Sequence, residues 1–309
     1  MTSFTLTPRG PFSMDPVRDL SCGFLQGSRR CGADPGSARL AFPRDGDFAV
    51  VGVALRWDGE RLHGRVEGAA DPETLRAQVA RTLCLDHDGA EFARLLERDP
   101  VLRRVAAGRP GFRPVVAYSP YVMGGWAILS QRLRMTQAAS LQVRIAEAAG
   151  DVIAVDGEPL TSFPRPQSLL ARPAFPGVPA EKWRRLQGLA AAALDGELDL
   201  ARLMSEPYQE ARERLMRLRG VGPWTADAIL MRGCGHTDLL PLSEPSLHRA
   251  VAAGYGLARI PDDEAVRELA EGWRPFRTWV SVLLISASGR GPRSGSRRSQ
   301  PAGFAPRAA

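Results

Sequence analysis

The segment LRGVGPWTADAIL, residues 218–230, combines residue types that could hold a phosphate group. Gly220 and Gly222 stand on either side of Val221, and the flanking residues have the pattern of helices. Glycine lets the backbone turn tightly and lets another molecule approach it closely. Pro223 suits the first turn of a helix, where outward-pointing amides and the positive dipole end favour phosphate. The alternative is a plain helix–helix turn packed into the core.

Phosphate contacts of this kind would place a protein on nucleic acid without reading its bases. The composition supports this weakly, because the formal net charge is +7 and only one of the 41 basic residues, Lys182, is a lysine. Arginine suits phosphate and planar recognition. Five arginines follow Ser288 in a stretch without acidic residues, so only about +2 remains on the rest of the chain. A GC-rich coding sequence explains the scarcity of lysine equally well.

The cysteines and histidines indicate neither a metal site nor a disulfide framework. The four cysteines are dispersed and show no C-x2–4-C spacing, and the four histidines have no ligand spacing. Such cysteines fit a reducing cytoplasm. The N-terminus lacks the order of a signal peptide, and no apolar run approaches the roughly 20 residues of a membrane span. We therefore expect a soluble cytoplasmic protein.

The first part of the chain predicts strands followed by helices. A turn at Asp58-Gly59 is expected to join two of the strands. Asp71-Pro72 is typical of a helix start, and one further helix is expected over residues 90–107. The expected strands are residues 4–12, 38–42, 48–57 and 62–68.

The second part predicts a mainly helical domain. Residues 108–114, rich in glycine and proline, mark the boundary. Val122, Trp126 and Leu129 recur at helical spacing, and Ser205 is expected to cap a later helix. The low-complexity tail is expected to be disordered. The predicted division is an α+β domain over 1–110, a helical domain over 111–288 and a basic tail over 289–309.

The hairpin and the segment DLLPLSEPSLHRAV after it resemble the helix-hairpin-helix DNA glycosylases, specifically the DNA-3-methyladenine glycosylase II group. That group shows L-x-G-(V/I)-G-x-W-T-A and then D-x-(F/L)-P-x-x-D-x-x-L. Other segments are similar in the same order, among them WAILSQRLRMTQAASLQVRIAEAAG, FPGVPAEKWRRLQ and WRPFRTWVSVLL, so the match covers most of residues 70–286. The resemblance implies an α+β fold: a mainly α-helical glycosylase domain after a small antiparallel sheet domain similar to the TATA-binding protein.

The resemblance implies a monofunctional DNA glycosylase that excises alkylated purines from duplex DNA in base excision repair. The nucleotide must be flipped, because its glycosidic bond is unreachable within the stack. Trp224 stands where bifunctional relatives carry a Schiff-base lysine, so hydrolysis without strand cleavage is expected. The expected partner is duplex DNA with damaged bases, bound by a monomer at a bacterial nucleoid and without a membrane. No cofactor is expected, although some members bind a monovalent cation through hairpin carbonyls.

The position of the family's catalytic aspartate, in D-x-x-L, is occupied here by Glu244. A carboxylate would stabilise the oxocarbenium-like sugar and orient the attacking water. Glutamate is one methylene longer, and misplacement by about 1 Å can cost on the order of 100-fold. The alternative is a non-catalytic protein that binds damaged DNA, with Glu244 only beginning a helix. Asp238, in the D-x-x-P position, is a less favoured substitute.

Other candidate residues follow from the resemblance. Gln131 and Arg132 occupy the place of the residue that wedges into the vacated stack, where relatives have Gln-Gln or Gln-Leu. Arg132 could fill the gap or bind phosphate. The expected DNA-binding residues are Gly220, Val221, Gly222, Thr225, Gln131 and Arg132. The expected base pocket consists of Trp224, Trp126 and Tyr121, for which core packing is the alternative.

Overall fold

Strands with one apolar face form a four-stranded antiparallel sheet near the N-terminus. The computed structural model describes residues 2–22 and 34–289. The sheet has the order β1-β4-β3-β2. Phe4 lies opposite Gly64, where a Cβ atom would stand 2.3 Å from the phenyl ring, so the glycine makes room for that ring. The strands are β1 (Thr2–Leu6), β2 (Ser37–Pro43), β3 (Val50–Trp57) and β4 (Leu62–Glu67).

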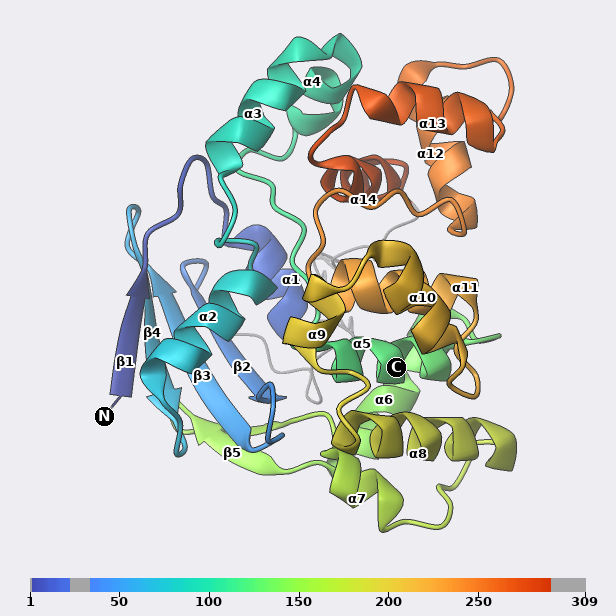
Figure 1. Cartoon of the computed structure of the whole chain (residues 1–309). Coiled ribbons are helices and arrows are strands. Elements are labelled where there is room, and N and C mark those ends of the chain that lie inside the picture. The colour runs from blue at the N-terminus through green and yellow to red at the C-terminus, as the bar shows by residue number, and fades with distance from the viewer. Residues whose placement is uncertain (1, 23–33, 290–309) are drawn as a thin grey trace, which may run out of the picture.

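The outer face of this sheet is partly covered by a later hairpin. Strands β5 (Val152–Val155) and β6 (Glu158–Thr161) pair with each other and pack against β2 and β3 (Figure 1). A Cβ atom at Gly52 would lie 2.5 Å from Cγ2 of Val155. The glycine therefore allows the hairpin to approach the sheet closely.

Most of the helices begin at a capping residue or at a proline in the first turn. Asp71 caps α2, where its carboxylate accepts the amide of Thr74 at 2.8 Å, as the Asp71-Pro72 pair predicts. The first helices are α1 (Asp15–Cys22), α2 (Pro72–Thr82), α3 (Gly89–Arg98), α4 (Pro100–Ala106), α5 (Pro120–Ser130), α6 (Met135–Ala149) and α7 (Pro166–Leu170). The later ones are α8 (Ala180–Leu194), α9 (Leu200–Ser205), α10 (Tyr208–Met216), α11 (Pro223–Ala228), the π-helix η1 (Ile229–Gly233), α12 (Pro245–Tyr255), α13 (Asp263–Glu271) and α14 (Arg277–Ala287).

Two predicted helix boundaries are wrong. The single helix expected over 90–107 is two helices, because Asp99 is extended before Pro100 and caps α4. Ser205 does not begin a helix but ends α9, where its hydroxyl donates to the carbonyl of Arg202 at 3.0 Å. The following helix, α10, begins after Pro207 instead.

Hydrophobic packing crosses the boundary expected at residue 110. One core joins the inner face of the sheet to α5, α8 and α11. A second core joins Phe92, Leu95 and Leu102 of α3 and α4 to α12, α13 and α14. Figure 1 shows α3 and α4 beside α12–α14, away from the sheet that precedes them in the chain. The tail expected over 289–309 lies, except for Gly289, outside the described residues.

Across residues 2–22 and 34–289, none of the helices combines the length and apolar character needed to span a membrane.

Candidate active site

The glycine hairpin joins α10 to α11, and its two glycines meet different requirements. Gly220 has a φ of +88°, and a Cβ atom there would lie 2.5 Å from Cδ of Arg185. Gly222 has an ordinary φ of −97°, and a Cβ atom there would meet no other group within 4 Å. Gly220 is therefore required by the fold, whereas Gly222 faces open space.

Glu244 is the N-cap of α12, and both of its carboxylate oxygens accept hydrogen bonds. Oε1 accepts the backbone amide of Ser246 at 2.9 Å, as a helix cap does. Oε2 accepts the indole Nε1–H of Trp224 at 2.7 Å. The predicted catalytic carboxylate thus lies directly against the helix that follows the glycine hairpin.

Trp224 is half-buried in the second position of α11. Its indole N–H orients Glu244, a role that the sequence did not predict. Its ring packs against the main core, and its stacking on a base stays a prediction. Thr225, buried on the same helix, supports the hairpin, with its hydroxyl 3.5 Å from Nε2 of Gln131.

Sequence reasoning missed Asp227, which is 5% exposed and connects three elements. Its Oδ1 accepts the hydroxyl of Tyr208 and Nε–H of Arg212, both at 2.7 Å, from α10. Its Oδ2 accepts the hydroxyl of Ser243, at 2.5 Å, from the loop that leads to Glu244. Burial, followed by the bond to Asp227, raises the pKa of the Tyr208 phenol. An acidic residue within the otherwise apolar run TADAILM was the available signal.

The two residues expected at the wedge position differ in their surroundings. Gln131 is the C-cap of α5, and its side-chain amide donates to the carbonyl of Gly220 at 2.9 Å and accepts from Arg185 at 3.1 Å. Gln131 therefore fastens the end of α5 to the hairpin. Arg132 is exposed and has a φ of +59°, a conformation that few non-glycine residues adopt. Of the pair, Arg132 is the one whose side chain faces solvent.

The lysine of this chain lies beside the same segment. Nζ of Lys182, on α8, donates to the carbonyls of Leu129 and Gln131, each at 2.8 Å. Burial, and then the nearby charge of Arg185, lower the pKa of Lys182. Lys182 thus binds the C-terminal end of α5, and its ammonium group uses two hydrogen-bond donors in doing so.

Two of the three residues expected to line a base pocket lie in the core, as the alternative of core packing predicts, and their part in a pocket stays a prediction. Tyr121 is fully buried, and its hydroxyl donates to the carbonyl of Pro164 at 2.9 Å. Trp126 is 3% exposed and belongs to the same core. Both side chains come from α5, an apolar helix that is covered on all sides, so their helical spacing marked the core.

Asp238 does not stand in for Glu244. Its carboxylate accepts from Arg274 at 2.8 Å and from Nε of Arg277 at 2.9 Å, near the start of α14. These ion pairs give it a structural role. Within the described ranges no group of three or more histidine, cysteine or acidic residues could hold a metal ion. The monovalent cation at the hairpin stays a prediction.

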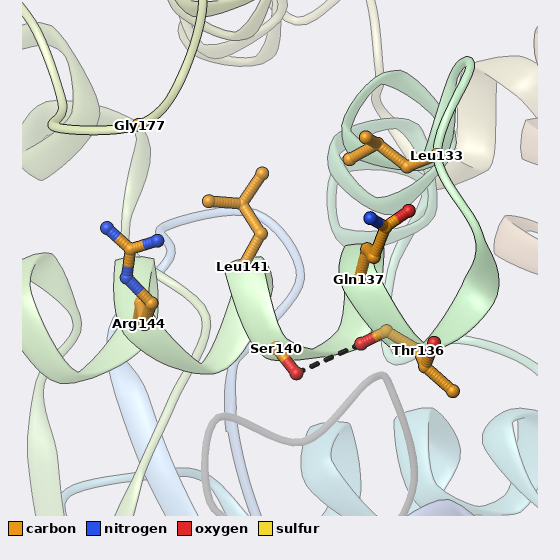
Figure 2. A pocket seen from close by; sticks show the side chains of 7 residues that line it. All are labelled: Leu133, Thr136, Gln137, Ser140, Leu141, Arg144 and Gly177. Carbon is orange, nitrogen blue, oxygen red and sulfur yellow. Dashed lines mark hydrogen bonds between the residues drawn. The ribbon is translucent and has the colours of Figure 1, made fainter.

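A surface depression of about 420 Å³ has Leu133, the residue after Arg132 in the chain, in its wall (Figure 2). Most of its wall comes from α6, and Arg144 is fixed there because it donates to the carbonyl of Pro176 at 2.8 Å. The lining residues are Leu133, Thr136, Gln137, Ser140, Leu141, Arg144 and Gly177. None of the predicted base-pocket residues is among them, so this depression is not the expected base pocket.

The chain is similar to proteins that are named as DNA repair enzymes. It is 32% identical over 287 residues to the "Probable bifunctional transcriptional activator/DNA repair enzyme AlkA" of Mycobacterium tuberculosis, covering 91% of this chain and 56% of that protein. It is 27% identical over 205 residues to the "DNA-3-methyladenine glycosylase" of Bacillus subtilis, covering 65% of this chain and 67% of that protein. The chain thus spans little more than half of the mycobacterial relative. No family model matches it.

The fold is similar to that of the "3-methyladenine dna-glycosylase from Archaeoglobus fulgidus", with a TM-score of 0.74. The two share 22% sequence identity, and the match covers 91% of this chain and 97% of the other. This likeness confirms the predicted α+β fold with its small N-terminal sheet and helical glycosylase domain. The chain belongs to the helix-hairpin-helix DNA glycosylase superfamily, in its DNA-3-methyladenine glycosylase II group.

Proposed function

We propose that this chain is a monofunctional DNA glycosylase that flips and excises alkylated purines, of the 3-methyladenine kind, from duplex DNA in base excision repair. The observation that carries the proposal is the carboxylate of Glu244, held by Trp224 and Ser246 immediately behind the glycine hairpin. The names of the relatives point to the same chemistry. We further propose that the protein acts on damaged duplex DNA as a monomer, at the nucleoid.

In this reaction the hairpin holds the DNA backbone, since Gly222 leaves open space for a phosphate group to approach the main chain. Arg132, exposed at the end of α5, fills the gap left by the flipped nucleotide. Both roles fix the position of the DNA and carry no base information themselves.

The chemical step breaks the bond between C1′ of the sugar and the base nitrogen. The electron pair leaves with the base, which loses the positive charge that alkylation gave it. The ionised carboxylate of Glu244 stabilises the oxocarbenium-like sugar until water adds its oxygen to C1′ and releases a proton. A cationic purine is already a good leaving group, so one well-placed charge supplies much of the assistance that this substrate needs.

A panel of lesion-containing duplexes, scored for free base and for abasic sites, tests the proposal. Release of alkylated purine, and no release from undamaged DNA, is expected. Tight binding to lesion DNA without base release would instead leave the alternative of a damage-binding protein.

The product should be an abasic site in an unbroken strand. The hairpin has Trp224 where an imine-forming lysine would be needed, and Lys182 is engaged by two carbonyl groups. Gel analysis should show breaks only after alkaline treatment, and borohydride should trap no covalent protein–DNA adduct. A trapped adduct would contradict this expectation, and its disappearance in Lys182→Arg would assign it to that amine.

Gly222→Ala should weaken duplex binding by about 10-fold without changing the melting temperature. The backbone at position 222 suits alanine and the site is open, so only the approach of a phosphate group is hindered, with the loss of a charge-assisted hydrogen bond. Fluorescence anisotropy with a labelled duplex and thermal melting measure the two quantities.

Two matched variants complete this experiment. Gly220→Ala should lower the free energy of unfolding by about 1–3 kcal/mol, because of its positive φ and its contact with Arg185. Gly108→Ala, at an open site outside the hairpin, should change neither quantity. Wild-type affinity in Gly222→Ala would remove the hairpin from the proposed DNA interface.

A further inference from the structure

Helix α11 holds the loop before α12 at two points that lie on one side of the helix. Trp224 binds the Glu244 carboxylate at 2.7 Å, and Asp227, three residues later, binds the Ser243 hydroxyl at 2.5 Å. Residues three apart on a helix share a face. Two consecutive residues, Ser243 and Glu244, are therefore fastened to two residues on one face of α11.

The carboxylate of Asp227 is itself held by hydrogen bonds from helix α10. Tyr208 and Arg212 of α10 both donate to Oδ1, which leaves Oδ2 for Ser243. The side chain is 5% exposed, so water has little access to these bonds. The hydroxyl of Ser243 consequently has a well-defined acceptor, and the loop has a defined distance from α11.

The position of the Ser243 backbone determines the position of the Glu244 backbone, because the two residues are consecutive. Glu244 is extended, with φ −90° and ψ 106°, and its amide donates to the carbonyl of Pro241 at 2.9 Å. Its carboxylate is bound at both oxygens, so a shift of the loop must either move the carboxylate or break one of those bonds. Misplacement of a reacting group by about 1 Å costs on the order of 100-fold in rate.

We propose that Asp227 and Ser243 are positioning residues that set the reach of the Glu244 carboxylate toward the reacting sugar. This inference rests on the proposed glycosylase function. Neither residue touches the substrate: Asp227 acts through Ser243, and Ser243 acts through the backbone of Glu244. The pair fixes the loop from which the glutamate side chain extends.

The test compares Ser243→Ala with Ser243→Thr and with a matched control. Ser243→Ala removes the hydroxyl and should lower the single-turnover rate of base release by about 10- to 100-fold, with the duplex Kd within about two-fold of wild type. Ser243→Thr keeps a hydroxyl and should restore most of the rate. Ser281→Ala removes another buried serine hydroxyl, bonded to the carbonyl of Arg277 on α14, and should leave the rate unchanged.

A second readout does not depend on activity. The indole N–H of Trp224, assigned in a proton–nitrogen correlation spectrum by its loss in Trp224→Phe, reports on the bond to Glu244. Ser243→Ala and Asp227→Asn should each shift this resonance, whereas Ser281→Ala should not. Ser243→Ala and Asp227→Asn both break the bond between residues 243 and 227. The variant that carries both changes should therefore release base at a rate close to that of the slower single variant.

The outcomes separate the two proposals. A wild-type rate and an unchanged indole resonance in Ser243→Ala would overturn the positioning role while leaving the glycosylase function intact. A shifted indole resonance in Ser243→Ala, together with a rate of base release no lower than that of Ser281→Ala, would also overturn it. The bond between Ser243 and Asp227 would then be only structural. A wild type that releases base from no lesion duplex would overturn the proposed function, and with it this role in catalysis.

Discussion

Glu244→Gln should bind a lesion-containing duplex as tightly as wild type and release its base about 100- to 1,000-fold more slowly. The substitution keeps the size of the side chain and removes the charge, so the loss falls on the chemical step. Single-turnover release of alkylated purine and anisotropy with the same duplex measure the two effects.

The substitution also disturbs a helix cap, which needs its own control. The carboxylate offers one oxygen to Trp224 and the other to Ser246, whereas an amide has a single acceptor oxygen, so the two donors no longer have an oxygen each. Asp262→Asn removes a charge from the N-cap of α13, where the side chain accepts the amide of Ala265 at 3.0 Å. This control should release base at the wild-type rate. Equal activity of Glu244→Gln and wild type would remove Glu244 from the mechanism.

Glu244→Asp should be about 10- to 100-fold slower than wild type, although the family motif that this segment resembles has aspartate at this position. The glutamate length allows one oxygen to cap α12 and the other to reach Trp224. Aspartate, one methylene shorter, keeps the cap and falls short of the indole. A rate equal to or above that of wild type would instead show that the pocket is not adapted to glutamate.

Arg81→Met should lower the free energy of unfolding by about 2–4 kcal/mol at pH 7, because it leaves a partly buried carboxylate without its partner. Arg81 is 7% exposed. Its guanidinium donates to Asp45 at 2.8 Å, to the carbonyl of Gly233 at 2.7 Å and to that of Tyr118 at 2.7 Å. It thereby joins the sheet domain to the end of the π-helix that follows the hairpin.

The pH dependence of this loss has a definite sign. Burial raises the pKa of Asp45 in the folded protein even though Arg81 opposes the shift, so the folded state binds a proton more readily than the unfolded state. The contribution of Asp45 to stability therefore falls as pH rises from its ordinary pKa, about 4, through the folded value. Without Arg81 the folded pKa rises further. The difference between wild type and Arg81→Met should thus be larger at pH 7 than at pH 4.5.

Urea unfolding at the two pH values measures this difference. Arg76→Met is the matched control, since it removes an arginine on the same helix whose ion-pair partner, Glu73, is 74% exposed and whose other bond, to the carbonyl of Thr5, is 3.2 Å long. It should cost less than about 1 kcal/mol. A loss that is the same at both pH values would contradict the role given to Asp45.

The sequence by itself predicted the features that depend on a few neighbouring residues. Asp71-Pro72 begins a helix, the turn at Asp58-Gly59 joins two strands, and the glycine hairpin lies between two helices. A cap, a turn or a positive φ is encoded locally, because the conformational preferences of one to four residues decide it. Glu244 was found differently, from the resemblance of the segment after the hairpin to the glycosylase motif, in which a carboxylate stands at that position.

The tertiary structure alone decided which distant residues meet. The bond from Ser243 to Asp227 spans 16 positions, and the bond from Arg81 to Gly233 spans 152. Tyr121, which the resemblance offered as a pocket residue, is fully buried because α5 is covered on all sides. Burial and long-range pairing depend on how all the elements pack together, and no local pattern of residues contains that information. For this reason the sequence located the catalytic candidate, and the fold showed what holds it in place.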